Sequence, residues 1–162
     1  ADDCFQVLRA AYFVENLSGL YRKHRGLMKD TVAWNIEQGL ALDAESIAGA
    51  VRARSRIFAN VARFLRGYDA WLLPTAQVLP FAHEIAYPTR IDDRALATYI
   101  DWVASCYWIT VSGHPGLTVP AGFARDAPGD PLLPVGLQLV GHFDRDEALL
   151  DVGERIEALL AP

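Results

Sequence analysis

A chain of 162 residues, of which 52% are hydrophobic and 22% charged, has the length and composition of one globular domain. Its net charge is −5, and its 15 Lys and Arg residues are scattered among 20 acids, which argues against nucleic acid and anionic membranes as partners. No apolar run approaches the length of a membrane span, and no signal-peptide pattern opens the chain. Cys4 and Cys106 lack metal-ligand spacing and fit a reducing, cytoplasmic compartment.

The first 67 residues are predicted to be helical. Apolar residues recur at helical spacing through residues 2–29, which indicates one or two helices ending in the polar stretch YRKHRG. Residues 30–42 have a weaker pattern, and we expect a short helical turn and a connection there. A long amphipathic helix follows, with Asp43 as its N-cap and Gly67 as the residue after its C-terminus. Its expected buried face is formed by Ile47, Val51, Ile57, Phe58, Val61, Phe64 and Leu65.

The middle of the chain combines a strand, a loop and a second helix. The stretch DAWLLP at residues 69–74 predicts a buried strand closed by a proline. Residues 75–90 contain two prolines and show no period, so we expect a long surface loop, which is uncommon unless it has a function. The second helix is expected from Asp92 or Asp93 to Ser112, where Gly113 stops it.

The C-terminal part predicts a β-hairpin followed by a helix. The strands GLTVP and VGLQLVG flank a loop rich in Pro, Gly and Asp. Asp144 and Glu147 have the spacing of a capping box at the start of the last amphipathic helix. This order of helices and strands indicates an α/β fold, which we expect to form one compact unit or a partial domain over residues 1–162, with no second domain.

By themselves, these residues do not assemble an active site. No G-x-S-x-G element is present, and Ser112 and His114 are better explained by a helix C-cap than by a nucleophile beside its base. The four histidines are far apart in the sequence without a metal-binding motif, so we expect no metal. Arg52, Arg56 and Arg63 share one helix face, for which solvation is the expected role and anion binding the alternative.

Two stretches resemble the C-terminal end of the amidase signature family: SGHPGLTVPAGF from residue 112 and LPVGLQLVGHFDRDEALL from residue 133. Upstream, RFLRGYDAWLLPTA and WNIEQGLALDAESIAGA are similar to segments of the same family, so the resemblance covers about residues 34–160. It implies the C-terminal part of the amidase signature fold, an α/β fold with a mixed β-sheet flanked by helices. That fold would be incomplete without an N-terminal core.

The residues that carry the resemblance are mainly glycines and prolines. Glycines suit positions where the backbone turns or approaches another segment closely, and prolines suit strand ends that need no ladder donor. Gln138 lies in an apolar strand, so we expect its side chain to be hydrogen-bonded to the backbone, with substrate contact as the alternative. The structural motif consists of Gly113, Pro115, Pro120, Gly122, Pro134, Gly136 and Gln138.

The resemblance implies amide hydrolysis, in which a carboxamide is converted to a carboxylic acid and ammonia. The family uses a Ser nucleophile, a second Ser in a cis peptide and a Lys, with an oxyanion hole and without metal or cofactor. This chain has no Ser-Ser pair, and its lysines are Lys23 and Lys29, outside the family's catalytic context. We therefore expect no catalytic residue in this chain, the reacting groups N-terminal to Ala1, and no activity of the isolated chain.

The same resemblance implies that the chain forms part of a substrate pocket. The residues expected there are Trp102, Cys106, Tyr107, Thr110 and His114, with a purely structural core role as the alternative for the first three. The family often has Asn where this chain has Thr110, so the identity of the amide stays open.

The expected partners are a small amide substrate, the missing N-terminal amidase core, and a second copy bound through exposed apolar surface. A noncatalytic subunit or binding module that keeps this scaffold is the alternative function. A transamidation subunit that serves tRNA charging ranks last, because Asp101 is offset from the position of the family's Asp.

Overall fold

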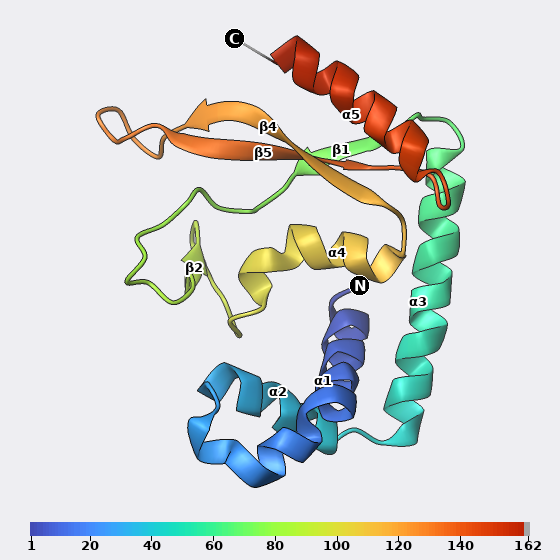
Figure 1. The fold of residues 1–162 in the computed structure, drawn as a ribbon, viewed down its shortest axis with the longest axis vertical. Helices are drawn as coiled ribbons and strands as arrows, with labels where there is room; N and C mark the ends of the chain where they lie inside the picture. Colours follow the sequence, from blue (N-terminus) through green and yellow to red (C-terminus); the bar gives the residue numbers. More distant parts are fainter. Residues whose placement is uncertain (161–162) are drawn as a thin grey trace. The chain divides into compact units, whose positions relative to one another are not determined.

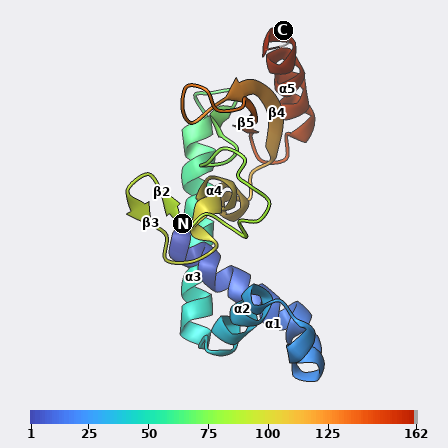
Figure 2. The same cartoon turned by 90° about the vertical axis from the view of Figure 1, so that its left-hand side faces the viewer.

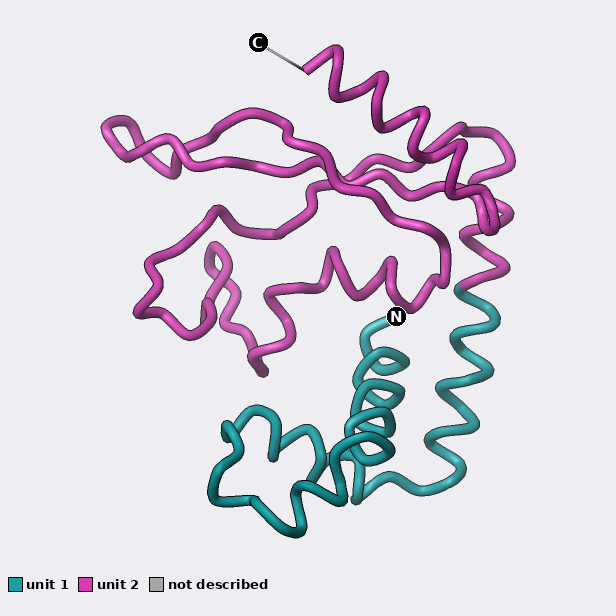
Figure 3. The backbone as a smooth tube through the Cα atoms, in the orientation of Figure 1, with its two compact units in different colours: residues 1–57 teal, residues 58–162 magenta. Residues whose placement is uncertain are grey.

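The computed structural model describes residues 1–160, which form two compact units, residues 1–57 and residues 58–160 (Figure 3). Each unit has its own packing and is described by itself. Within the described residues, no helix has the length and apolar character that crossing a lipid bilayer requires.

The first unit is built on an antiparallel pair of helices, α1 (Asp2–His24) and α2 (Asp30–Leu40), joined by the short 3-10 turn Arg25–Leu27 (Figure 1). The helices predicted within residues 2–29 are confirmed. The short turn predicted for residues 30–42 is wrong, because α2 is a helix of 11 residues. Its Ala33 and Ile36 are fully buried, so tertiary packing completes a helix that the local pattern alone did not indicate.

Close contact between α1 and α2 depends on a glycine and a buried amide. A Cβ at Gly39 would overlap the backbone of Ala10 and the side chain of Val14, so only glycine fits at this crossing. The Arg9 guanidinium lies 4.8 Å from the centre of the Phe13 ring and donates a 3.1 Å hydrogen bond to Asn35 Oδ1. Asn35 is therefore buried with its carbonyl oxygen satisfied.

Helix α3 spans Ala44–Leu65, and its start follows the prediction. The Asp43 carboxylate accepts a 2.7 Å hydrogen bond from the Ser46 backbone N–H, which confirms the predicted N-cap. The predicted cap at Gly67 is wrong: the helix ends at Leu65, and Gly67 has no left-handed backbone. The predicted buried face is only partly correct. Leu65 is buried and Ile57, Phe58 and Val61 are half-buried, whereas Ile47, Val51 and Phe64 are exposed.

The second unit contains a three-stranded antiparallel sheet in the order β1-β5-β4. The bounds are Trp71–Pro74 for β1, Gly116–Ala124 for β4 and Leu133–Val140 for β5. The predicted strand and hairpin are therefore confirmed. The expectation of a buried first strand is wrong, since β1 lies at a sheet edge and Leu72 is 49% exposed.

Two helices lie on opposite faces of this sheet, as Figures 1 and 2 show. Helix α5 (Asp146–Leu160) covers the face formed by Val119 and Leu139, against which its Leu149 is buried. Helix α4 (Ala104–Ser112) lies on the other face. Side chains alternate along each strand, so one face forms an apolar core with α5 and the other meets α4 and the segment after β1.

The predicted capping box of α5 is wrong. The helix begins at Asp146, two residues after Asp144. Asp144 has a positive φ of 59°, in a turn that is closed by a 3.2 Å hydrogen bond from Arg145 N–H to the His142 carbonyl. The chain therefore turns through Asp144 before the helix starts, and its carboxylate does not occupy the N-cap position.

The second predicted helix is correct only in its C-terminal half. Residues 90–95 form a small hairpin, β2 (Arg90–Ile91) and β3 (Arg94–Ala95), followed by the 3-10 turn Asp101–Val103 and then α4. The Asp101 carboxylate accepts hydrogen bonds from the N–H groups of Ala97 and Thr98 at 2.8 and 3.0 Å, which stabilises a turn in place of a helix. The stop at Gly113 is confirmed, with φ of 70°.

Candidate functional site

The second unit contains a groove of about 1080 Å³ on the α4 side of its sheet. Its walls come from β1, the segment of residues 75–81, the β2–β3 hairpin, the start of β5 and helix α4 with the turn before it. In Figure 1 the segment after β1 and the strand β2 lie on the same side of the sheet as α4. A volume of this size matches the cavities that hold small organic ligands.

The floor of the groove is fixed by close packing of the chain just after β1 onto β5. Thr75 N–H donates a 3.1 Å hydrogen bond to the Gly136 carbonyl. A Cβ at Gly136 would lie 2.8 Å from Thr75 Oγ1 and 3.1 Å from Thr118 Cγ2. Glycine is therefore required at this position for the chain to lie flat on the strand.

Helix α4 holds the same point from its other side. The Thr75 carbonyl oxygen accepts hydrogen bonds from the Ser105 hydroxyl and the Cys106 thiol, both at 3.0 Å. Both donors lie at the start of α4, so the first residue after β1 is bound to the sheet and to the helix at once. The two contacts hold this end of the groove in one conformation.

The far end of the segment is attached to the turn before α4. Gln77 Nε2 donates a 3.1 Å hydrogen bond to the Asp101 carbonyl oxygen. The rings of Phe81 and Trp102 meet edge to face with their centroids 5.4 Å apart. The first part of the predicted loop, residues 75–81, is therefore held at Thr75, Gln77 and Phe81, and Trp102 connects it to the groove wall.

Aromatic and aliphatic side chains dominate the interior of the groove. Trp71 and Leu73 of β1 point to the α4 side because they pair with Val140 and Gln138, which lie on that face. Trp108 lines the groove from α4 and is 41% exposed. An indole with this much free surface can accept a further apolar contact.

The charged side chains that line the groove are Arg90, Asp92 and Asp126, and all three are exposed. Arg90 donates a 3.0 Å hydrogen bond to the Asp93 carbonyl within its own hairpin. Water therefore screens these three charges, and the other side chains that line the groove are uncharged.

Of the five predicted pocket residues, Trp102 lines the groove and the other four do not. Cys106 and Tyr107 face the packed interior, with Tyr107 4% exposed. Thr110 is exposed and donates its hydroxyl hydrogen to the Cys106 carbonyl at 3.2 Å. His114 lies beyond the end of α4, so the structure does not bring these residues together around one cavity.

The Ser112–Gly113–His114 stretch forms the helix C-cap that the sequence indicated. The Ser112 hydroxyl donates a 2.7 Å hydrogen bond to the Ile109 carbonyl. The His114 ring lies beside Phe58, with centroids 4.9 Å apart, and its Nδ1 is 3.0 Å from the Ser112 carbonyl oxygen. Since a carbonyl oxygen only accepts, Nδ1 carries the hydrogen. Ser112 and His114 are therefore not a nucleophile and its base.

The motif residues behave mainly as the sequence indicated. Gly113 and Gly122 have positive φ values of 70° and 100°, and Gly136 allows the close approach of Thr75. The expectation that the prolines lie at strand ends holds for Pro115, just before β4, and for Pro134, the second residue of β5. It is wrong for Pro120, which lies inside β4 and pairs with Gly136 next to a register shift. We expected the Gln138 side chain to be hydrogen-bonded to the backbone. This is wrong for its carbonyl oxygen, because the buried Oε1 has no hydrogen-bond partner among the described residues.

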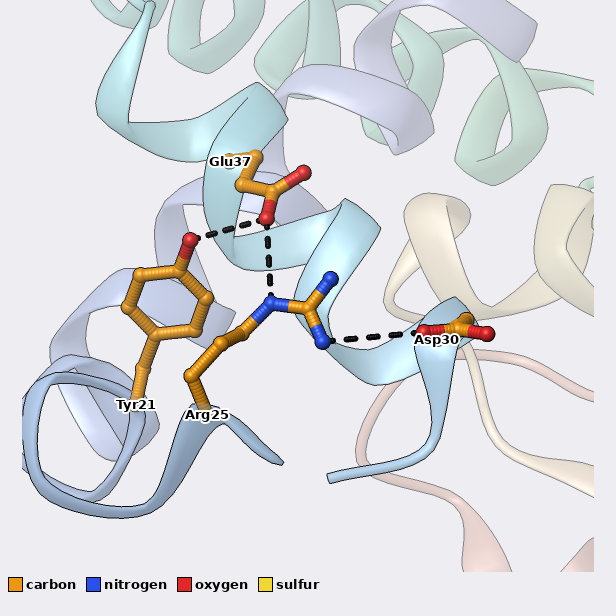
Figure 4. Close-up of polar contacts among 4 residues, drawn as sticks. All are labelled: Tyr21, Arg25, Asp30 and Glu37. Atoms are coloured by element: carbon orange, nitrogen blue, oxygen red, sulfur yellow. Dashed lines mark hydrogen bonds and ion pairs between the residues drawn. The ribbon is translucent and has the colours of Figure 1, made fainter. Parts of the chain in front are cut away.

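A second polar cluster lies on the first unit, and Figure 4 shows its four side chains. The Tyr21 hydroxyl donates a 2.8 Å hydrogen bond to Glu37 Oε1, which also lies 3.4 Å from Arg25 Nε. Asp30 lies 3.6 Å from the other end of the same guanidinium. The hydrogen bond to the Glu37 carboxylate raises the pKa of Tyr21. This exposed cluster ties the turn between α1 and α2.

Sequence reasoning missed most of the groove. Trp71, Thr75, Phe81 and Trp108 were not expected at a site, although the unusual length of the loop after β1 was the available signal. In the described part of the chain, no group of His, Cys, Asp and Glu side chains has the arrangement of a metal site.

Comparison with known proteins gives a consistent result. The amidase family model matches residues 10–150. A glutamyl-tRNA(Gln) amidotransferase subunit of Salinibacter ruber is 38% identical over 110 residues, which cover 66% of this chain and 19% of the relative. An acylamidase of Rhodococcus erythropolis is 25% identical over 140 residues, covering 86% of this chain and 28% of the relative.

Solved structures share the fold. A crystal structure of an amidase superposes with a TM-score of 0.79 at 24% identity, over 98% of this chain and 35% of that structure. A bacterial aryl acylamidase of the amidase signature family gives a TM-score of 0.73 at 23% identity, over 94% of this chain and 31% of that structure. The chain thus spans about a third of these structures and a smaller part of the two relatives.

Proposed function

This chain belongs to the amidase family, and we propose that it forms the C-terminal part of an amide hydrolase. The enzyme that contains it converts a small carboxamide to a carboxylic acid and ammonia. The observation that carries this proposal is the family match over residues 10–150, combined with a superposition that uses nearly the whole chain but about a third of a solved amidase.

The proposed role of this part is to supply framework and one wall of the substrate site. The 162 residues contain no Ser-Ser pair. The hydroxyls of Ser105 and Ser112 donate to the carbonyl groups of Thr75 and Ile109, so neither lies beside a base that activates it. These observations support a division in which the nucleophile, base and oxyanion hole come from the rest of the enzyme.

The groove supports the second half of this role. Its floor is bound to both the sheet and α4, and Trp102 lies in its wall. Among the other residues of the predicted pocket, Cys106 acts by holding Thr75, while Tyr107, Thr110 and His114 support α4 and its end. A rigid wall of this kind positions a substrate against reacting groups carried by another segment.

The proposed partner is the remaining amidase core. Leu72 on the free edge of β1 is 49% exposed and Phe123 on β4 is 69% exposed, although both lie in strands. Apolar side chains on sheet edges are surfaces that a neighbouring element normally covers. Without that core, the same surface supports self-association of the chain.

A noncatalytic subunit is the second candidate function. The absence of a Ser-Ser pair from these 162 residues supports it, and the relative in Salinibacter ruber, named as one subunit of an amidotransferase, supports a role within an assembly. In this case the scaffold and groove would serve binding or assembly, and no amide would be cleaved by any protein that contains this chain.

Ammonia release from simple amides tests both candidates. We expect the 162-residue chain to release no more ammonia from propionamide or benzamide than a heat-denatured sample does. A longer protein that contains this chain together with the proposed amidase core is expected to hydrolyse at least one of these amides. Turnover by the 162-residue chain would overturn the division of roles, and inactivity of the longer protein would favour the noncatalytic subunit.

A further inference from the structure

We infer that the groove of the second unit binds a neutral aromatic group, so that the enzyme acts on amides with an aryl substituent in preference to short aliphatic amides. The part of this inference that concerns amide hydrolysis rests on the proposed function. The part that concerns binding of an aromatic group rests only on the residues of the groove.

The first observation is the chemistry of the interior. Trp71, Trp102 and Trp108 reach the groove from three different elements, and Phe81 adds a fourth ring from the segment after β1. Phe81 and Trp108 are 37% and 41% exposed, so both rings keep free surface. Aromatic rings prefer further rings in offset or edge-to-face contact, the geometry already present between Phe81 and Trp102.

The second observation is the distribution of charge. Arg90, Asp92 and Asp126 are exposed residues of the groove lining, and the Arg90 guanidinium donates to a carbonyl of its own hairpin. The other side chains that line the groove are uncharged, so the only counter-charges it offers to an ionic ligand are these three water-screened groups. A neutral carboxamide fits such a site better than a carboxylate or an ammonium group does.

The third observation is that the groove is held open in advance. Thr75 is bound to Gly136 on one side and to Ser105 and Cys106 on the other, and Gln77 is bound to Asp101. When a rigid ring binds to a preformed apolar site, little conformational entropy is lost. An acetamide-sized ligand would leave most of a space of about 1080 Å³ unfilled.

The experiment measures binding of benzamide and acetamide to the complete 162-residue chain by nitrogen-15 NMR of the tryptophan indole groups. The chain has four tryptophans, of which Trp34 lies in the first unit outside the groove and serves as an internal reference. Benzamide is expected to shift the signals of Trp71, Trp102 and Trp108 and to leave Trp34 unchanged. Its Kd is expected to be at least about tenfold below that of acetamide, from burial of one ring.

Two variants test the assignment to the groove. Trp102→Leu removes a ring of the wall and is expected to raise the benzamide Kd about tenfold, whereas Trp34→Phe is the matched control and leaves the Kd unchanged. The backbone amide spectrum verifies that each variant folds. Equal affinity for benzamide and acetamide, an equal shift of Trp34, or an unchanged Kd in folded Trp102→Leu would each overturn the inference.

Binding and turnover separate this inference from the proposed function. Benzamide binding by the chain, together with inactivity of the longer protein on every amide, supports the groove and overturns amide hydrolysis. Hydrolysis of acetamide and benzamide with equal kcat/KM, without indole shifts in the chain, overturns the groove and leaves the proposed function in place.

Discussion

Gly136 and Thr75 approach so closely that a Cβ on residue 136 would lie 2.8 Å from Thr75 Oγ1. The contact joins the central strand to the first residue after the edge strand, at the floor of the groove. Because Thr118 Cγ2 lies 3.1 Å from the same point, the added methyl group has no free direction.

Gly136→Ala is therefore expected to lower the free energy of unfolding by about 1–3 kcal/mol through overpacking. Chemical denaturation measures the change. Gly19→Ala is the matched control, because a Cβ at Gly19 in α1 meets nothing within 4 Å, and it is expected to stabilise the chain by about 0.5–1 kcal/mol. Removing Thr75 Oγ1 by Thr75→Ala in the Gly136→Ala background should recover part of the loss. Additive effects of the two substitutions would contradict the direct contact.

The carbonyl oxygen of Thr75 gives a second prediction, because Ser105 and Cys106 both donate to it. Ser105→Ala removes one donor from a buried position and is expected to lower the free energy of unfolding by about 1 kcal/mol. Thr110→Val is the matched control, since the Thr110 hydroxyl is exposed and bonds only within its own helix. Equal loss in both variants would show that the contact to Thr75 contributes nothing specific.

The end of α4 gives a third prediction. Gly113 has φ of 70°, a conformation in which a Cβ is strained. Gly113→Ala is expected to cost about 1–2 kcal/mol, and Gly113→Asn less, because asparagine tolerates the left-handed region. Thermal unfolding of the two variants shows which one loses more stability. If a steric clash with neighbours were the cause, Gly113→Asn would lose more than Gly113→Ala, because asparagine is the larger residue.

The first strand, the hairpin and the long helices were predictable because each has a local signature. The α5 face of the sheet alternates with period two, and α3 starts at a capping aspartate whose bond to Ser46 is present. The stop at Gly113 followed from the same local rules.

The errors have causes that lie outside the local pattern. Helix α2 forms because Ile36 packs against α1, and the helix predicted from Asp92 gives way to a turn held by the Asp101 carboxylate. The groove could not be predicted because its aromatic residues come from separate segments that only the sheet pairing and α4 bring together. What the sequence does contain is the unusual length of the segment after β1.

The exposed apolar side chains on the sheet edges predict self-association. Phe123 is 69% exposed and Leu72 is 49% exposed, on the two outer strands of the sheet. The weight-average mass measured by light scattering is expected to rise above the monomer mass of 17.9 kDa with concentration. A double variant with Phe123→Ser and Leu72→Thr should reduce the rise. Leu27→Ser in the first unit, which removes a more exposed leucine away from any strand, should not. A constant monomer mass at all concentrations would contradict this prediction.

The N-cap of α3 makes stability depend on pH in a predictable direction. Hydrogen bonds from Ser46 lower the pKa of Asp43 below its ordinary value. A lowered folded-state pKa means that the ionised carboxylate contributes stability above the unfolded value, about 3.9, and that this contribution is lost as the pH falls through the folded value. The difference in thermal midpoint between the natural chain and Asp43→Ala is therefore expected to have its full size at pH 7 and to shrink below about pH 4.

Asp43→Asn is the matched control, because asparagine caps a helix without titrating. The difference in thermal midpoint between Asp43→Asn and Asp43→Ala should therefore not change over that pH range. If the advantages of aspartate and asparagine over alanine fell together on acidification, the loss would come from elsewhere in the chain and the Asp43 carboxylate would not be its source.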